Sequence, residues 1–281
     1  MLNDNCLSLI LSTNHFDELV LNSKLKCKSK NINCFLLSDK VKNIIKEGNL
    51  YYEENDAGLL IFHDKQAVFQ LYLFLNINIP FNINRKNKPI ISEFPGYISL
   101  NEKSKKCIQH LEANGFLYNT TVRQLIIDYD IEKTNFDFLT KEKYDYEITF
   151  AKPEHLDAIY KIWVDSFDPI VNPLPSKVEL ATQIDLKETF CAISKTNEVV
   201  GTLQAELTDN EARYSRGAVL PEHRRKKLLQ SMTYFSIKNA FQKNITKHIL
   251  WVEEKNEASN ACHLKMGYEF NKKFSEQYLL K

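Results

Sequence analysis

The sequence predicts a mixed α/β fold with two tandem domains, each a mixed, mostly antiparallel sheet flanked by helices. The chain has 281 residues, which suits two domains of ordinary size. Apolar patterns of strand and helix period alternate along it, and such elements pack as helices on a sheet. A helix, a glycine and a strand recur in both halves, around Gly115 and Gly267. We therefore expect one domain at 1–140 and a second at 141–281.

The first half is expected to hold three helices and several strands. Phe16, Val20 and Leu21 fall on one face of the first helix. Apolar runs bounded by turn residues indicate the strands. The order is helices at 13–24 and 38–47, a hairpin of strands at 58–63 and 67–75, a loop at 76–89, a strand at 89–94, a short helix before Gly115 and a strand at 122–130. The charged, unpatterned segment 131–144 marks the domain boundary.

The second half follows the order β-α-α-β-β-β-α-β-α-β. Pro153 opens a helix in which Leu156, Ile159 and Trp163 recur at helical spacing. A longer helix, of about 20 residues, is expected to follow Pro221. The strands are expected at 145–153, 189–194, 198–208, 212–219, 248–254 and 275–280, and a last short helix at 257–266.

An internal echo indicates a duplication. HLEANGF at 110–116 parallels HLKMGY at 263–268, and the hairpin LLIF-turn-AVF near residue 62 parallels CAIS-turn-EVV near residue 193. The intervening segment is shorter in the first half by about the length of the helix after Pro221. We interpret this as a first copy that lost its central helix, although two ordinary strand-helix-strand units would also resemble each other.

The composition excludes several classes of protein. Thirty-seven basic and 36 acidic residues give a net charge of +1, which argues against a nucleic-acid-binding protein. No apolar run reaches the roughly 18 residues of a membrane span, and the first residues lack the basic region of a signal peptide. We expect a cytoplasmic protein with no membrane partner. The six cysteines have no C-x-x-C spacing, so no metal site is predicted; they are Cys6, Cys27, Cys34, Cys107, Cys191 and Cys262.

A cationic turn in the second half is the main candidate for chemistry. The strand ending at Val219 leads through Pro221 into Arg224-Arg225-Lys226-Lys227 and then a helix. A strand-to-helix turn exposes helix N–H groups that favour an anion such as a pyrophosphate. Basic residues in a first helical turn oppose the helix dipole, and a polyanionic ligand would offset that cost. A solvated basic face would account for the residues equally well.

This turn resembles the signature of the GNAT acyltransferase superfamily, Val-x-Pro-x-x-(Arg/Gln)-x-x-Gly-x-(Gly/Ala). Val219, Pro221 and Arg224 match it, whereas Lys227 and Leu229 replace the two small residues. The resemblance implies that acetyl-CoA, or another acyl-CoA, is the co-substrate. Its pyrophosphate would lie on the turn, and its pantetheine arm would pair with backbone near Val219. The implied binding residues are Val219, Pro221, Arg224, Arg225, Lys226, Lys227, Leu228, Leu229 and Asn256.

A second motif of the same superfamily, Asn-x-x-Ala-x-x-x-Tyr-x-x-x-Gly-Phe, is similar to NEASNACHLKMGY. Its places are filled by Asn256, Ser259, His263, Gly267 and Tyr268. The resemblance implies that Asn256 contacts the pantetheine arm. His263 stands where the family has a tyrosine that protonates the departing thiolate, and a histidine can do so as an imidazolium. An inert helical histidine is the alternative.

A general base is needed because an amine must lose a proton to attack a thioester. The candidates are carboxylates near the diverging strands, namely Glu206, Glu211, Glu253 and Glu254, and we favour Glu253 because it ends the strand that leads to Asn256. In the first half, His110 or Leu111 takes the place of His263 and the phosphate-binding helix is missing. We expect no acyl-CoA site there.

These residues lead to one principal hypothesis and two alternatives. The chain is expected to move an acyl group from acyl-CoA to a primary amine of a small molecule or amino acid, by direct attack in a ternary complex. Weaker resemblances to the glycine N-acyltransferase-like branch and to mycothiol-synthase-type tandem enzymes fit this hypothesis. The alternatives are a protein N-acetyltransferase and a non-catalytic module for CoA binding or dimerisation. The acceptor, the acyl length and whether the chain forms a homodimer stay open.

Overall fold

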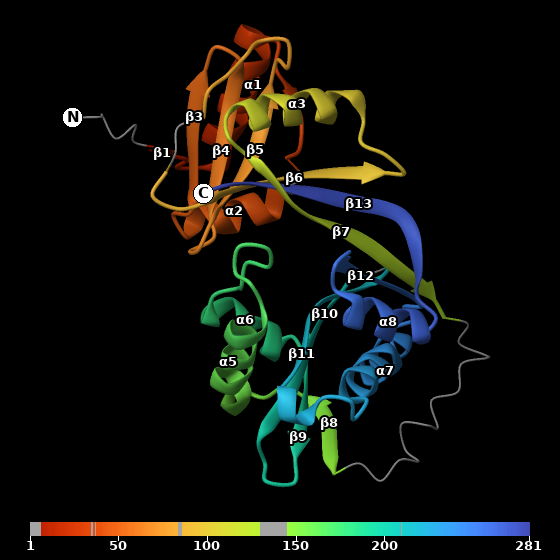
Figure 1. Ribbon diagram of the computed structural model, residues 1–281. Coiled ribbons are helices and arrows are strands. Elements are labelled where there is room, and N and C mark those ends of the chain that lie inside the picture. The colour runs from red at the N-terminus through yellow and green to blue at the C-terminus, as the bar shows by residue number, and fades with distance from the viewer. Residues whose placement is uncertain (1–6, 35, 37, 84–85, 130–144, 209) are drawn as a thin grey trace. The chain divides into compact units, whose positions relative to one another are not determined.

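The chain folds as two compact units. Figure 1 shows the computed structural model, which describes residues 7–34, 36, 38–83, 86–129, 145–208 and 210–281. The first unit comprises Met1–Val122 together with Lys273–Lys281, and the second comprises Arg123–Lys272. The fold class is the one that the sequence predicts, a tandem of mixed sheets flanked by helices.

The first unit is a mixed sheet with helices on both faces. Its strands are ordered β1-β3-β4-β5-β6-β13, and among the described residues β5 and β6 form the parallel pair of this order. Strands β4 and β5 are apolar on both faces, which is typical of central strands covered on each side. The elements are β1 (Ser8–Leu9), α1 (Thr13–Cys27), β2 (Lys30–Asn31), α2 (Ser38–Lys46), β3 (Leu50–Asn55), β4 (Gly58–Asp64), β5 (Phe69–Leu75), β6 (Ile90–Tyr97), α3 (Glu102–Ala113) and β7 (Leu117–Asp128).

Two apolar clusters lie on opposite faces of β4 and β5. Leu60 and Phe62 pack in the cluster that includes Leu111 of α3, whereas Leu59 and Ile61 pack in the cluster that includes Leu19 of α1. Alternate residues of a strand point to opposite faces, so one strand supports both clusters. Helix α3 therefore covers one face of this sheet and α1 the other.

In its described part, the second unit repeats this arrangement and adds helix α7 between its two parallel strands. Its strands are ordered β8-β9-β10-β11-β12, with β7 beyond β12, and among the described pairs the one between β11 and β12 is parallel. Helix α7 covers one face through Met232, and α5 covers the other through Trp163. The elements are β8 (Tyr146–Phe150), α5 (Leu156–Ser166), α6 (Lys177–Asp185), β9 (Thr189–Ser194), β10 (Val199–Leu207), β11 (Ala212–Val219), α7 (Leu228–Phe241), β12 (Lys247–Glu253), α8 (Glu257–Lys265) and β13 (Glu269–Leu280), with 3₁₀ turns at Pro153–His155 and Pro221–His223.

The last strand of each repeat contributes to the other unit. Residues Lys273–Leu280 of β13 pair antiparallel with Ile90–Tyr97 of β6, in the first unit. The end of β7 lies in the second unit, where the Tyr129 N–H donates to the Thr246 carbonyl just before β12. The expected domains, 1–140 and 141–281, therefore differ from the compact units by this exchange. Their expected boundary falls within 130–144, outside the described residues.

The repeat aligns differently from the sequence echo. Strand β5 is parallel to β6 as β11 is to β12, so the hairpin β4–β5 corresponds to β10–β11 and not to β9–β10, as the echo of LLIF with CAIS indicated. The difference arises from β3, a strand that the sequence pattern does not predict because acidic residues interrupt its apolar residues. In the described part of 76–89 the chain forms turns and bends and no helix, which agrees with the loop expected there.

The helices of the described chain are all too short or too polar to span a lipid bilayer.

Candidate functional site

Strands β11 and β12 diverge at the centre of the second unit. Within these two described strands, the parallel ladder joins only Ala212–Tyr214 to His248–Leu250, although β11 continues to Val219 and β12 to Glu253. The divergence begins at a β-bulge, where Ser215 and Arg216 together oppose the single residue Gln204 of β10. A bulge bends its strand and increases the local twist. Past the bulge, β11 therefore presents an edge towards β12 with which no described strand pairs.

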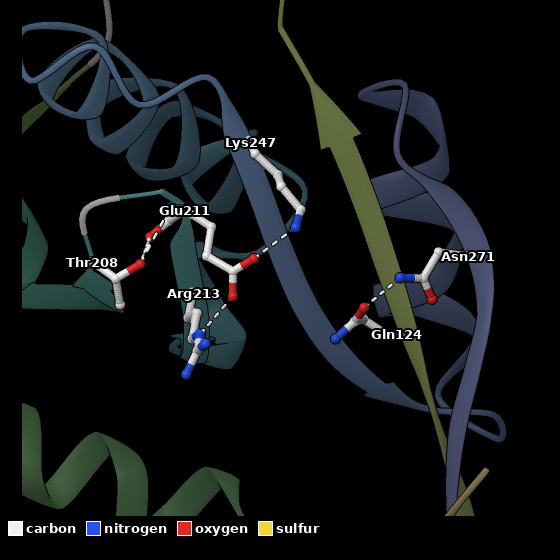
Figure 2. A network of polar contacts seen from close by, with 6 residues as sticks. All are labelled: Gln124, Thr208, Glu211, Arg213, Lys247 and Asn271. Carbon is white, nitrogen blue, oxygen red and sulfur yellow. Dashed lines mark hydrogen bonds and ion pairs between the residues drawn. The ribbon is translucent and has the colours of Figure 1, made fainter. Parts of the chain in front are cut away.

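Charged residues fix the closed end of the two strands. Glu211 accepts hydrogen bonds from Arg213 Nε and Lys247 Nζ, both at 2.8 Å, and so links the start of β11 to the start of β12 (Figure 2). Figure 2 also shows Gln124 of β7 accepting a hydrogen bond from Asn271 of β13. The bonds from Lys247 and Arg213 hold the pKa of Glu211 below its ordinary value. Glu211 is therefore a structural carboxylate and a poor base.

The other candidate bases are distributed along the same strands. Glu206 lies opposite Arg213 in the ladder between β10 and β11, at the closed end. Glu254 forms an ion pair with Arg123. Glu253 ends β12, on the diverging side, and Asn172 Nδ2 lies 3.5 Å from its Oε1. Of the four carboxylates, Glu253 is the one that sits at the end of a diverging strand without an ion pair among the described residues.

The cationic turn precedes helix α7 and does not form its first turn. After the 3₁₀ turn at Pro221–His223, Arg224 is extended, Arg225 and Lys227 have positive φ values of 62° and 56°, and α7 begins at Leu228. The sequence pattern predicts a helix start directly after Pro221, and the left-handed residues explain the later start. Among the described residues no side chain caps the start of α7, so its first N–H groups have no capping side-chain acceptor there. The geometry suits an anion.

Arg224 and Lys226 of the turn contact neighbouring groups. Arg224 Nε donates to the carbonyl of Val219 at 3.1 Å, and so ties the turn to the end of β11. Lys226 Nζ lies 2.7 Å from the Tyr146 hydroxyl and over the ring of the same residue. All four basic residues are exposed to solvent. The turn therefore combines exposed positive charge with a helix start that no described side chain caps.

The two positions that depart from the signature are accommodated in different ways. Lys227 takes the left-handed conformation that a glycine adopts without strain. Leu229 lies against Gly217 of β11, where an added Cβ would stand 2.8 Å from Leu229 Cδ1. Gly217 thus makes the room that the larger residue at 229 requires.

Helix α8 orients His263. Asn256 is the N-cap, and its Oδ1 accepts a hydrogen bond from the Ser259 N–H at 3.1 Å. His263 is only 7% exposed, and its Nδ1 lies 2.8 Å from the Ser259 carbonyl oxygen. Because a carbonyl only accepts, Nδ1 carries the proton and Nε2 has the lone pair in the neutral ring. Burial lowers the pKa of His263, so the neutral form prevails at pH 7.

Arg216, which the sequence motifs do not indicate, faces the side of the sheet covered by α5. Its Nη1 donates to Gln204 Oε1 at 2.8 Å and its Nη2 to the Pro173 carbonyl at 2.7 Å, and the guanidinium lies over the ring of Trp163. Burial lowers the pKa of Arg216 to about 10, so it stays charged at neutral pH. An arginine within a strand pattern gives no sequence signal, and only the bulge explains its position.

The loop between α5 and α6 brings two residues to the diverging strands. Pro173 accepts the bond from Arg216 on β11, and Asn172 approaches Glu253 on β12. Within the described residues, no cluster of histidine, cysteine, aspartate or glutamate side chains has the arrangement of a metal site.

Comparisons with known proteins agree with this architecture. Residues 156–268 match the sequence profile described as Acetyltransferase (GNAT) family. A tandem GNAT protein from the clavulanic acid biosynthesis pathway is similar over 98% of both chains, with a TM-score of 0.58 and 10% identity. A GCN5-related N-acetyltransferase from Sphaerobacter thermophilus is similar over 85% of this chain and 84% of its own, with a TM-score of 0.57 and 9% identity. No curated protein matches the sequence.

The diverging strands and the tandem sheets define a tandem GNAT fold. Within it, residues 156–268 form a domain of the GNAT acetyltransferase family.

Proposed function

We propose that the second unit transfers an acyl group, in the simplest case acetyl, from acyl-CoA to a primary amine of a small molecule or amino acid. One observation carries the proposal: β11 leaves its parallel partner at the bulge and runs directly into the cationic turn. An extended, amide-containing ligand that ends in a pyrophosphate fits such an edge followed by such a turn. The match of residues 156–268 to the GNAT acetyltransferase family supports acyl-CoA as the acyl donor.

The donor would be held by residues of β11, the turn and α8. Backbone near Val219 would pair with the pantetheine arm, and the turn from Pro221 through Arg224, Arg225 and Lys226 to Lys227 would hold the pyrophosphate. The N–H groups of Leu228 and Leu229 would add donors from the helix start. Asn256 would contact the arm from α8. Its Oδ1 accepts the N-cap bond, so its Nδ2 would make this contact.

The acceptor would bind on the face that carries Arg216 and Glu253. Glu253 would accept the proton of the attacking amine. The fixed positive charge of Arg216 would disfavour an ammonium ion nearby, and so would lower the pKa of the amine. Direct attack forms the amide bond and breaks the thioester bond, with the electron pair leaving on sulfur.

His263 would return a proton to the departing thiolate. Since its Nδ1 proton is held by the Ser259 carbonyl, the donating atom would be Nε2 of the imidazolium. This role therefore predicts activity at the acidic side of the neutral range.

The test is CoA release from acetyl-CoA in the presence of pooled amines, amino acids or peptides. Release with the small amines supports the proposal, and release with peptides alone would instead identify a protein N-acetyltransferase. Tight binding of acetyl-CoA without release from any pool would identify a non-catalytic module. Glu253→Gln should lower the rate by about 10²–10⁴-fold, and the adjacent Glu254→Gln serves as its control.

A further inference from the structure

The first unit contains the same strand divergence as the second. Strands β5 and β6 are parallel, and their ladder joins only Phe69–Leu71 to Ile90–Ser92. Strand β5 continues to Leu75 and β6 to Tyr97, beyond the last pair. In the repeat, β5 and β6 hold the places of β11 and β12. The first unit therefore has an edge of β5 like the edge to which we assign the pantetheine arm in the second.

A segment of the chain itself lies on that edge. Strand β2 pairs antiparallel with β5, with Lys30 opposite Leu75 and Asn31 opposite Phe74. The N–H of Ile32 extends the contact by donating to the Leu73 carbonyl at 2.9 Å. The segment Lys30–Asn33 thus runs down β5 towards the point at which β5 and β6 separate.

Asn33 completes the contact with four side-chain hydrogen bonds. Its Oδ1 accepts from the Leu73 N–H at 2.8 Å, and its Nδ2 lies within 3.2 Å of the Leu71 carbonyl, the Ser92 hydroxyl and the Glu93 carbonyl. The amide therefore bridges β5 and β6 at the end of their ladder. Asn33 is only 3% exposed. Removing it would leave buried backbone groups without partners, which is costly.

The equivalent loop of the second unit, residues 167–176, does not pair with the diverging edge of β11. Both segments connect the first and second helices of their repeat, α1 to α2 and α5 to α6. Residues 167–176 form turns and no strand, and their contacts with the diverging strands are the bond to the Pro173 carbonyl and the approach of Asn172 to Glu253. The two repeats thus differ in whether this loop occupies the edge.

We infer that Lys30–Asn33 is a built-in occupant of the first unit's strand divergence, which closes that unit to a pantetheine-like ligand. The chain then carries one acyl-CoA site, in the second unit. Like such a ligand, this segment pairs through its backbone with β5, and it places an amide, that of Asn33, where β5 and β6 separate. The described part of the loop 76–89 forms no helix, so the first unit also lacks the helix start that would hold a pyrophosphate.

Hydrogen exchange on the full chain tests the occupancy directly. The amides of Ile32 and Leu73 should exchange at least about 100-fold more slowly than that of Gln66, which is bonded within an exposed turn. This protection should not change when acetyl-CoA is added to saturation. Fast exchange of Ile32 without ligand, or exchange that accelerates with acetyl-CoA, would overturn the inference.

A titration separates this inference from the proposed function. One acetyl-CoA bound per chain supports it, and two would overturn it. If no acetyl-CoA binds, the proposed function fails, while the exchange of Ile32 and Leu73 still decides whether the segment is seated.

A variant with a side chain of equal size tests the role of the Asn33 amide between β5 and β6. Asn33→Asp keeps the acceptor for Leu73 but loses the donor to three oxygens, so exchange at Ile32 should rise at least tenfold. Asn49→Asp, whose amide makes one exposed bond to Glu47, is the matched control and should change nothing. Equal exchange in both variants would overturn the role of Asn33.

Discussion

Lys227 has a backbone conformation that costs free energy for any residue with a side chain. Its φ is 56°, and the left-handed region costs a non-glycine residue about 1 kcal/mol. Lys227→Gly and Lys227→Ala remove the same charge, so a comparison of the two isolates the backbone. We expect the glycine variant to have a free energy of unfolding higher by about 1 kcal/mol than the alanine variant.

Denaturant unfolding of both variants measures this difference. Lys226 is the control, because it has no positive φ and glycine there should be the less stable variant. Equal stability of Lys227→Gly and Lys227→Ala would mean that the turn relaxes and stores no strain.

His263 makes a prediction about pH. Burial lowers its pKa below 6.5, so the imidazolium is lost as the pH rises through a value lower than that of a free histidine. If the imidazolium donates the proton, kcat should have an alkaline limb below pH 6.5 and His263→Ala should lower kcat by about 10²–10⁴-fold. His263→Tyr should move that limb upwards, since tyrosine stays protonated to about pH 10. An alanine variant with near-normal kcat would show that His263 only packs against Tyr268.

At the scale of elements, the cationic turn makes a separate prediction. Arg224→Ala with Lys227→Ala should raise the KM for acyl-CoA, and the loss should shrink at high salt because exposed charges are screened over about 8–10 Å. Lys195→Ala with Lys177→Ala removes two exposed charges elsewhere in the second unit and is the control. A KM unchanged by the turn variant would identify a solvated basic face without a ligand.

The closed end of β11 and β12 makes the fold sensitive to acid. Tyr214 bonds His248 Nδ1 at 2.9 Å, and burial lowers the pKa of His248 to about 4. The unfolded chain, with a histidine pKa near 6.5, therefore binds the proton more readily than the folded chain. We expect the free energy of unfolding to fall as the pH drops from about 6.5 towards 4, as followed by denaturant unfolding. His248→Phe should reduce this dependence without abolishing it, because burial also lowers the pKa values of His63 and His263. A slope unchanged by that variant would assign the dependence to those other groups.

The sequence predicted elements better than their connections. Helices α1, α2, α3 and α8 begin and end close to their expected positions, because apolar spacing and local stop signals determine them. The later start of α7 depends on left-handed residues that carry no glycine signal, Arg225 and Lys227. The position of Arg216 depends on a bulge, and the strand exchange depends on pairing between segments far apart in sequence. Such pairing leaves no local pattern to read.

At the scale of the whole molecule, the exchange predicts how the chain responds to division. A fragment of residues 1–140 lacks Lys273–Leu280, the strand that pairs with β6. Tyr278 and Leu280 of that strand are also part of the apolar cluster under α3. We expect the fragment to show a lower melting temperature and faster hydrogen exchange in β6 than the full chain. Addition of a peptide of residues 269–281 should restore both, and a peptide with Tyr278→Ser and Leu280→Ser is the control. A fragment that is stable without the peptide would contradict this expectation.

The exchanged strand also orders events during protein synthesis. The ribosome makes all of Arg123–Lys272 between the two parts of the first unit. At about 5–20 residues per second, β6 therefore waits several seconds or more for its partner strand. Until then its edge is open to other chains, as unpaired strand edges are. The second unit ends at Lys272, whereas the first unit also needs Lys273–Lys281. The second unit can therefore complete its fold before the first does. This chain can therefore fold its second unit first, whereas the N-terminal domain usually folds first.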